Sequence, residues 1–182
     1  KIRYMFGGQC KVPMVLRIVT GAMGENAAQH SQSFYSFFVH VPGLIVATPS
    51  TPYDAKGLLN TSIVSDNPVI FVEHKRTVNM KGEVPEEYYT IPFGKAEVKR
   101  EGTDITLVAT QALMHDALKV AEDLQQKEQV SIEVIDPRTL KPLDKETIFH
   151  SVEKTGRLIV ADEGWLHCGM ASEIAAIVAE ER

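Results

Sequence analysis

Short apolar runs alternate along the chain with longer segments of helical periodicity. The runs at 12–19, 44–49 and 69–74 are rich in Val and Ile and nearly continuous, which is typical of strands that a parallel sheet buries on both faces. The segments between them, 31–41 and 51–65, have the length of helices. Strand–helix–strand alternation at this spacing predicts right-handed crossovers and a parallel sheet.

The helix expected at 51–65 has a clear start signal. Thr51 is a candidate N-cap, and Pro52 occupies the first helical position, where its missing N–H costs nothing. Apolar residues follow at helical spacing, namely Ala55, Leu58, Leu59 and Ile63.

A polar stretch at 75–103 interrupts the alternation, which then resumes. The stretch is rich in charge and contains two prolines, so it predicts a connection between two domains, with a short strand possible at its end. After it we expect strands at 105–110, 130–136 and 157–163, and helices at 111–128, 143–155 and 169–182. The fold class predicted from the pattern is α/β, with two parallel or mostly parallel sheet units.

Composition and charge exclude several function classes. The chain has 182 residues, 44% hydrophobic and 24% charged, with a net charge of −5, so the basic footprint of a nucleic-acid-binding protein is absent. Cys10 and Cys168 lie too far apart for a CxxC metal or redox motif. No apolar run reaches the length that crosses a bilayer, and we expect a cytoplasmic protein. Because the chain opens at Lys1 without Met, we expect a fragment or a processed chain.

The candidate chemistry lies beyond the first predicted strand, in the segment AAQHSQSF. Neither GxGxxG nor a Walker lysine loop occurs, and Gly21 and Gly24 predict a turn more readily than a ligand contact. His40, His74, His115 and His150 fit structural roles better than catalytic ones. His167 lies in the loop after a later strand, where α/β sheets place ligands, and His30 holds the same kind of position after the first strand. If functional, His30 should lie partly exposed at the mouth of that strand and the edge of a cleft, its ring oriented by a polar neighbour.

Six separate segments carry a resemblance to a known family across nearly the whole chain. The segments are AAQHSQSF, PGLIVATPSTPYDAKGLL, DNPVIFVEHK, KGEVPEEYYTIPFGKAEVKREGTDITLVA, EVIDPRTLKPLD and SVEKTGRLIVADE. Over these segments the chain resembles the β-subunits of thiamine-diphosphate-dependent 2-oxo acid dehydrogenases, the transketolase-like group that includes the pyruvate, branched-chain and acetoin enzymes. The loop DEGWLHCGMASEIAA is similar to the acetoin type, without deciding the substrate.

The resemblance implies a domain division and a catalytic residue. It assigns 1–90 to part of a pyrimidine-binding domain and 91–182 to part of a transketolase C-terminal domain. The family's histidine near the thiazolium and the incoming lipoyl group corresponds to His30, with Gln29 and Ser31 beside it.

The resemblance also implies that the cofactor site is shared. Thiamine diphosphate with Mg²⁺ is the family's cofactor, and the GDG motif that holds the Mg-diphosphate belongs to the α-subunit; no GDG occurs here. The family's glutamate that activates the aminopyrimidine lies upstream of the matching segment. We therefore expect this chain to carry part of a half-site and not to bind the cofactor tightly alone.

A potassium ion is a further implication, since some members hold one in the β-subunit. The matching positions are Val12, Met14, Val15, Ser62, Ser65 and Asn67. A hard cation needs several oxygens, and a serine stands here where an aspartate is common.

The implied reaction is oxidative decarboxylation of a 2-oxo acid, or cleavage of acetoin, with acyl transfer to lipoamide. The implied partners are an α-subunit, a lipoyl acyltransferase and further β chains. Self-association is also expected because the last predicted helix carries an apolar stripe that a truncated domain would leave exposed, namely Met170, Ile174, Ile177 and Val178. The alternatives are a non-catalytic interaction module that keeps the subunit contacts, and a transketolase or deoxyxylulose-phosphate-synthase relative, which KGEVPEE and QHSQS disfavour.

Overall fold

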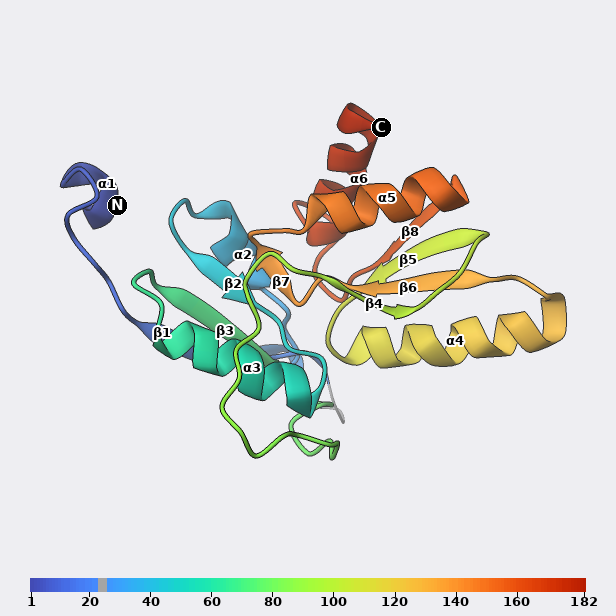
Figure 1. The fold of residues 1–182 in the computed structure, drawn as a ribbon, viewed down its shortest axis with the longest axis horizontal. Coiled ribbons are helices and arrows are strands. Elements are labelled where there is room, and N and C mark those ends of the chain that lie inside the picture. The colour runs from blue at the N-terminus through green and yellow to red at the C-terminus, as the bar shows by residue number, and fades with distance from the viewer. Residues whose placement is uncertain (23–25) are drawn as a thin grey trace.

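The computed structural model describes residues 1–22 and 26–182, which form two four-stranded sheets and their connecting helices (Figure 1). The first half contains α1 (Ile2–Met5), β1 (Val15–Thr20), the 3-10 helix η1 (Ala28–His30), α2 (Tyr35–His40), β2 (Ile45–Ala47), α3 (Pro52–Ile63) and β3 (Val69–His74). The second half contains β4 (Glu97–Arg100), β5 (Ile105–Ala109), α4 (Ala112–Glu128), β6 (Ile132–Asp136), β7 (Thr139–Lys141), α5 (Lys145–Thr155), β8 (Leu158–Ala161) and α6 (Met170–Glu181). The predicted α/β alternation is confirmed.

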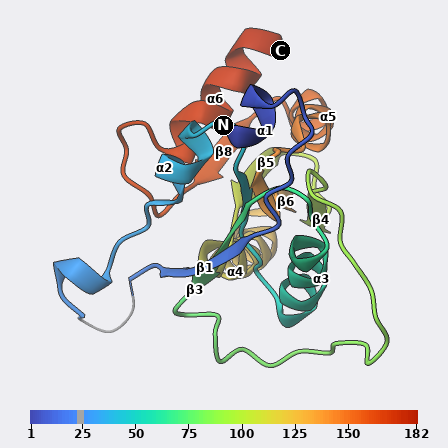
Figure 2. The ribbon, with the colours of Figure 1, turned by 90° about the vertical axis from the view of Figure 1, so that its left-hand side faces the viewer.

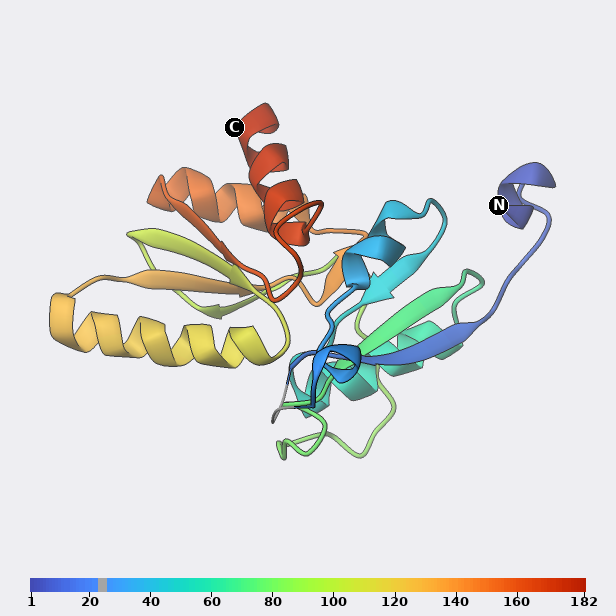
Figure 3. The same ribbon diagram turned by 180° about the vertical axis from the view of Figure 1, so that it is seen from behind.

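Each sheet is mostly parallel, as predicted, with one antiparallel strand. The first has the order β1-β3-β2-β7, in which β7 runs antiparallel to β2. The second has the order β4-β6-β5-β8, in which β4 runs antiparallel to β6. In Figures 1 and 3, α4 covers one face of the second sheet while α5 and α6 cover the other.

Strand β7 was not predicted. It comes from the second half of the chain and completes the first sheet, pairing Lys141 with Val46 and Thr139 with Ala47. The Lys141 ammonium donates to the carbonyl of Val39 at 2.6 Å, near the end of α2. Three residues between prolines are too short to show a hydrophobic period, so only the neighbouring strand makes this segment a strand.

The connection from β3 to β4 runs around the outside of α3 (Figure 2). The Lys56 ammonium of α3 donates to the carbonyl oxygens of Glu86 and Glu87 at 3.1 and 2.9 Å. The rings of Tyr53 and Tyr89 stack with centroids 4.6 Å apart. The polar stretch is therefore irregular, as predicted, but it is held along one helix by specific contacts.

One apolar cluster is shared by the two halves. Its buried members come from both sheets and from α2, α5 and α6, namely Tyr35, Val46, Ile70, Val72, Val108, Ile135, Leu140, Ile148, Met170 and Ile174. The prediction that the α6 stripe is exposed is therefore wrong for Met170 and Ile174, while Ile177 is half-buried. Met170 and Ile174 are 4% and 2% exposed, and Val178 packs against the same cluster. The stripe faces inward because α6 packs on β8.

The predicted burial of the first strand on both faces is also wrong. β1 lies at the edge of the first sheet and pairs only with β3. Leu16 and Val19 are 43% and 52% exposed, whereas β3, with a strand on each side, is almost wholly buried. A continuous apolar run thus identifies the strand but not its place in the sheet.

The Ile174→Ala variant tests the inward orientation of α6. Removing a buried isoleucine side chain should lower the free energy of unfolding by about 2–5 kcal/mol, because a cavity remains in the shared core. The matched control is Ile63→Ala in α3, whose side chain is 63% exposed. Denaturant titration of both variants makes the comparison, and equal losses would contradict the placement of Ile174.

Candidate functional site

The two sheets face each other through the carboxyl ends of their parallel strands. Ser50, just after β2, accepts from the Gln111 backbone N–H at 2.7 Å, just after β5. Thr48 and Thr110 are joined through their hydroxyls at 3.0 Å in the same place. Open α/β sheets place ligand sites at these strand ends, so the junction is where functional side chains are expected.

At one side of the junction, the Glu163 carboxylate joins three segments of the first half. It accepts from the Ser33 hydroxyl at 3.1 Å and from the Ala22 backbone N–H at 3.4 Å. His74 Nε2 lies 2.6 Å from the same carboxylate. Because His74 Nδ1 accepts from the Arg76 backbone N–H at 3.1 Å, the proton of the neutral ring must sit on Nε2 and point at Glu163.

Gly21 makes this arrangement possible. Its φ is +88°, and a Cβ at this position would lie 2.0 Å from His74 Nε2. Only a residue without a side chain permits the ring to approach the backbone this closely. The turn predicted here from Gly21 thus serves a protein contact, and Gly24 lies outside the described residues.

His30 lies exposed in η1, beyond the carboxyl end of β1. Its neighbours Gln29 and Ser31 are exposed and half-buried. The predicted exposure is found, but the predicted orienting group is not, because the imidazole makes no hydrogen bond with any described residue. The local turn is held by backbone contacts, in which the N–H groups of His30 and Ser31 donate to Ala27 and Ala28 at 3.3 and 3.4 Å.

A second carboxylate beside Glu163 ties the end of β8 to α2 and α6. Asp162 accepts from the Tyr35 hydroxyl, from the Gly164 N–H at 3.0 Å and from the Ala171 N–H at 3.1 Å. Burial, and then this carboxylate, raise the pKa of Tyr35 far above its usual value. The phenol is therefore a permanent hydrogen-bond donor.

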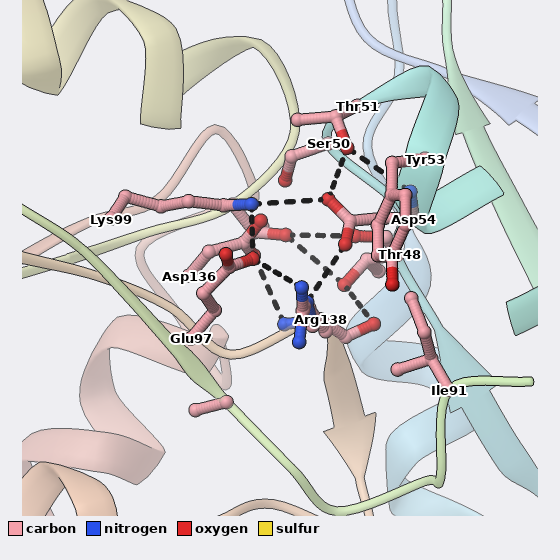
Figure 4. A network of polar contacts seen from close by, with 12 residues as sticks. Thr48, Ser50, Thr51, Tyr53, Asp54, Ile91, Glu97, Lys99, Asp136 and Arg138 are labelled. Carbon is pink, nitrogen blue, oxygen red and sulfur yellow. Dashed lines mark hydrogen bonds and ion pairs between the residues drawn. The ribbon is translucent and has the colours of Figure 1, made fainter. Parts of the chain in front are cut away.

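At the other side of the junction, Asp54 is fully buried in an ion network (Figure 4). Arg138 Nε lies 2.8 Å from one of its oxygens, and Lys99 Nζ lies 3.3 Å from the other. Both cations also contact Glu97. Asp54 sits in the first turn of α3, where the N-cap Thr51 accepts from its backbone N–H at 3.1 Å, as the sequence predicted.

Asp136, at the end of β6, lies beside this network and is also fully buried. One oxygen accepts from the Arg138 backbone N–H at 3.0 Å, and the other has no hydrogen-bond partner among the described residues. Burial is the main reason that the pKa of Asp136 is raised to about 7, and the nearby Asp54 charge adds to it. Asp136 thus titrates near neutrality.

The candidate potassium residues gather at the opposite, amino edge of the first sheet. The Met14 carbonyl accepts from the Val69 N–H at 2.8 Å, and the Val12 N–H donates to the Asp66 carbonyl at 2.9 Å. The Asn67 N–H donates to the Ser65 hydroxyl at 3.1 Å. Val15 begins β1, and the buried Ser62 lies near the end of α3, its hydroxyl 2.7 Å from the Leu58 carbonyl.

Two family models match the chain, one in each half of the fold. A family model described as the transketolase pyrimidine binding domain matches residues 1–81, and one described as the transketolase C-terminal domain matches residues 94–182. The acetoin:2,6-dichlorophenolindophenol oxidoreductase subunit beta of Bacillus subtilis is 52% identical over 100% of this chain and 53% of its own length. The chain belongs to the transketolase-like family, and the curated proteins to which it is similar are named as dehydrogenase or oxidoreductase β-subunits.

Other relatives of this transketolase-like chain act on different substrates according to their names. The pyruvate dehydrogenase E1 component subunit beta of Rickettsia felis is 46% identical over 100% of the chain and 55% of its own length. The 2-oxoisovalerate dehydrogenase subunit beta of Bacillus subtilis is 45% identical over 99% of the chain and 55% of its own length. The chain thus spans about half the length of the curated relatives it matches.

A solved structure shows the same fold. It is described as a split-gene transketolase, an inactive beta4 tetramer, and aligns with a TM-score of 0.80 over 99% of this chain and 58% of its own. The sequence identity is 22%, so this likeness supports the fold alone.

Sequence reasoning missed the contacts that organise the junction. Glu163, Asp54 and Arg138 were not singled out, and His74 was judged more structural than catalytic. The available signal was position, because His74 ends β3 and Glu163 follows β8, both at the carboxyl edge of a parallel sheet. Which of them meet depends on how the two sheets pack.

The Arg138→Met variant tests the ion network. Leaving the buried Asp54 carboxylate with Lys99 alone should lower the free energy of unfolding by about 3–5 kcal/mol, since an under-compensated buried charge is costly. The control is Lys127→Met, which breaks a pair with Asp123 that is 67% and 53% exposed, and should cost about 0.3–0.5 kcal/mol. Urea titration measures both, and similar losses would show that Arg138 does not compensate Asp54.

The Asp136→Asn variant tests the buried acid through the pH dependence of stability. The folded-state pKa of about 7 lies above the ordinary value, so between about pH 4 and pH 7 the folded state holds a proton that the unfolded state has lost. Stability from this group is therefore present at low pH and falls as pH rises, by up to about 1.4 kcal/mol per pH unit.

The asparagine variant should remove this decline, so its stability relative to the wild type should rise with pH across the window. Denaturant titration at half-unit pH steps makes the measurement. Asp123→Asn, which changes an exposed carboxylate, serves as the control. Parallel wild-type and Asp136→Asn profiles would contradict the raised pKa.

Proposed function

We propose that this chain forms part of the β-subunit of a thiamine-diphosphate-dependent dehydrogenase that acts on acetoin or a 2-oxo acid and passes an acyl group to lipoamide. The β-subunit relatives at 45–52% identity support the enzyme class. The observation that carries the assignment to this site is the exposed imidazole of His30 beyond the carboxyl end of β1. A group that transfers protons to a mobile substrate must be reachable in this way.

In this proposal His30 acts as the proton donor to lipoamide. The substrate-derived carbon keeps the electron pair of the bond that decarboxylation or cleavage breaks. When this carbon bonds to one dithiolane sulfur, the S–S bond breaks, and the other sulfur leaves as a thiolate that takes up a proton. Imidazole is the side chain that most often donates or accepts protons in enzyme reactions. Gln29 and Ser31 are proposed to border the same approach path.

The cofactor site is proposed to lie between this chain and an α-subunit. Among the described residues, no group of three or more His, Cys, Asp or Glu side chains is placed to hold a metal ion. No step through Mg-diphosphate is assigned to these residues. The α-subunit is proposed to supply that part, and a lipoyl acyltransferase the acyl acceptor.

Two further features belong to the proposal. A potassium ion at the amino edge of the first sheet would take carbonyl and hydroxyl oxygens of Val12, Met14, Val15, Ser62, Ser65 and Asn67, although the Met14 carbonyl already accepts from the Val69 N–H. Further β chains are proposed to associate through surfaces other than the buried stripe of α6.

No helix within residues 1–22 and 26–182 is long and apolar enough to cross a bilayer.

The His30→Ala variant, in the β-subunit assembled with its α-subunit, tests the proton-donor role. Acyl transfer to lipoamide should fall by about 100- to 10,000-fold, the usual contribution of one positioned acid or base. Turnover with an artificial electron acceptor should fall much less, since it needs no proton at a dithiolane sulfur. His150→Ala, an exposed histidine on α5, is the control.

The two assays separate the possible roles of His30. Equal losses in both would assign it to substrate binding or cofactor positioning. No loss in either would remove it from the reaction and leave the chain's part in subunit contacts, the non-catalytic alternative, as the better description.

A further inference from the structure

One carboxylate of the second half contacts both flanks of the segment that carries His30. Ala22 precedes this segment and donates its backbone N–H to Glu163 Oε1 at 3.4 Å. Ser33 follows it, is 6% exposed, and donates its hydroxyl to Glu163 Oε2 at 3.1 Å. The Gly21 N–H also donates to the Gln32 carbonyl at 3.1 Å, which brings the two flanks together.

His74 is the third group that contacts the Glu163 carboxylate. It is 2% exposed, and its Nε2 lies 2.6 Å from Glu163 Oε2, the oxygen that also accepts from Ser33. The approach of this ring requires Gly21, which begins the same flank. Glu163 therefore fixes the ends of the segment against β3 and β8, while His30 itself has no side-chain partner among the described residues.

We propose that Glu163 is the positioning residue for His30, an inference that rests on the proposed proton-transfer role of that histidine. Glu163 does not act on the substrate. It sets the place of the exposed imidazole by holding Ala22 and Ser33 on either side of it. A displacement of about 1 Å in a reacting group is enough to cost a large factor in rate.

The chemistry of the contact requires an ionised carboxylate. All three partners donate, since the Arg76 N–H at Nδ1 forces the His74 proton onto Nε2. A glutamine at position 163 has the same shape but one NH₂ group. In one amide orientation that NH₂ faces the donors of His74 and Ser33, and in the other it faces the Ala22 N–H. Neither orientation satisfies every group.

The first experiment measures the segment itself, in the chain as described and without any partner. Residue-level amide hydrogen exchange by NMR should show the amides of Gly21, Ala22, His30 and Ser31 exchanging about 10- to 100-fold faster in Glu163→Gln than in the wild type, because a charge-assisted contact is lost on both flanks. Glu173→Gln, which removes an exposed carboxylate on α6, should leave these amides unchanged.

A second, less disruptive variant keeps the test decisive if Glu163→Gln does not fold. Ser33→Ala removes one of the three donors and should raise the same exchange rates by a smaller factor. If both variants, or Ser33→Ala alone where Glu163→Gln does not fold, leave the exchange of these amides unchanged, Glu163 does not position the segment.

The second experiment uses the assembled α/β enzyme and the same two assays as for His30. Glu163→Gln should lower acyl transfer to lipoamide while largely sparing turnover with the artificial acceptor, and the double variant with His30→Ala should be no slower than His30→Ala alone. A residue that only stabilises the fold would lower both activities and add to the His30 effect. That result would overturn the proposal.

The two experiments distinguish failure of the proposed function from failure of the positioning role of Glu163. If His30→Ala has no effect on either activity, the proposed function fails, and the exchange measurement still decides whether Glu163 holds the segment. If His30→Ala has its expected effect but Glu163→Gln changes neither exchange nor acyl transfer, only the positioning role fails.

Discussion

The structure depends on how carboxylates are accommodated where the carboxyl ends of two parallel sheets meet. Asp54 and Asp136 are fully buried there, and Glu163 lies at the same junction. A buried carboxylate is tolerated only if it is paired, hydrogen-bonded or protonated. Asp54 is paired with two cations, and Asp136 has a raised pKa. Glu163, whose side chain is 26% exposed, accepts from three donors.

These solutions also fix how the two halves sit against each other, because the partners come from opposite halves. Asp54 lies in α3, while Arg138 and Lys99 come from the second half. Strand β7, which belongs to the second half, also completes the first sheet by pairing with β2. In addition, one apolar cluster contains buried side chains of both halves. Movement of one half against the other would uncover charge as well as apolar surface, which makes the relative placement costly to change.

The candidate site inherits its geometry from this junction. His30 lies in a short turn. The local backbone hydrogen bonds of this turn are long, 3.3 and 3.4 Å, so they stabilise it only weakly. What fixes the flanks of that turn is Glu163, more than 120 residues further along the chain. Under the proposed role, an exposed imidazole between two anchored flanks suits a group that must meet a substrate delivered from outside.

The sequence by itself determined the elements and the family. Hydrophobic periodicity predicted the long strands and helices, and Thr51 caps α3 as expected. Gly156 ends α5 as a left-handed C-cap with φ 68°. These features are local, so a short window of residues carries them. The tertiary structure decided that β1 is an edge strand, that three residues between prolines form β7, that the α6 stripe faces inward, and that Glu163 meets Ala22 and Ser33. Each depends on which distant surface packs nearby, and local periodicity carries no information about that choice.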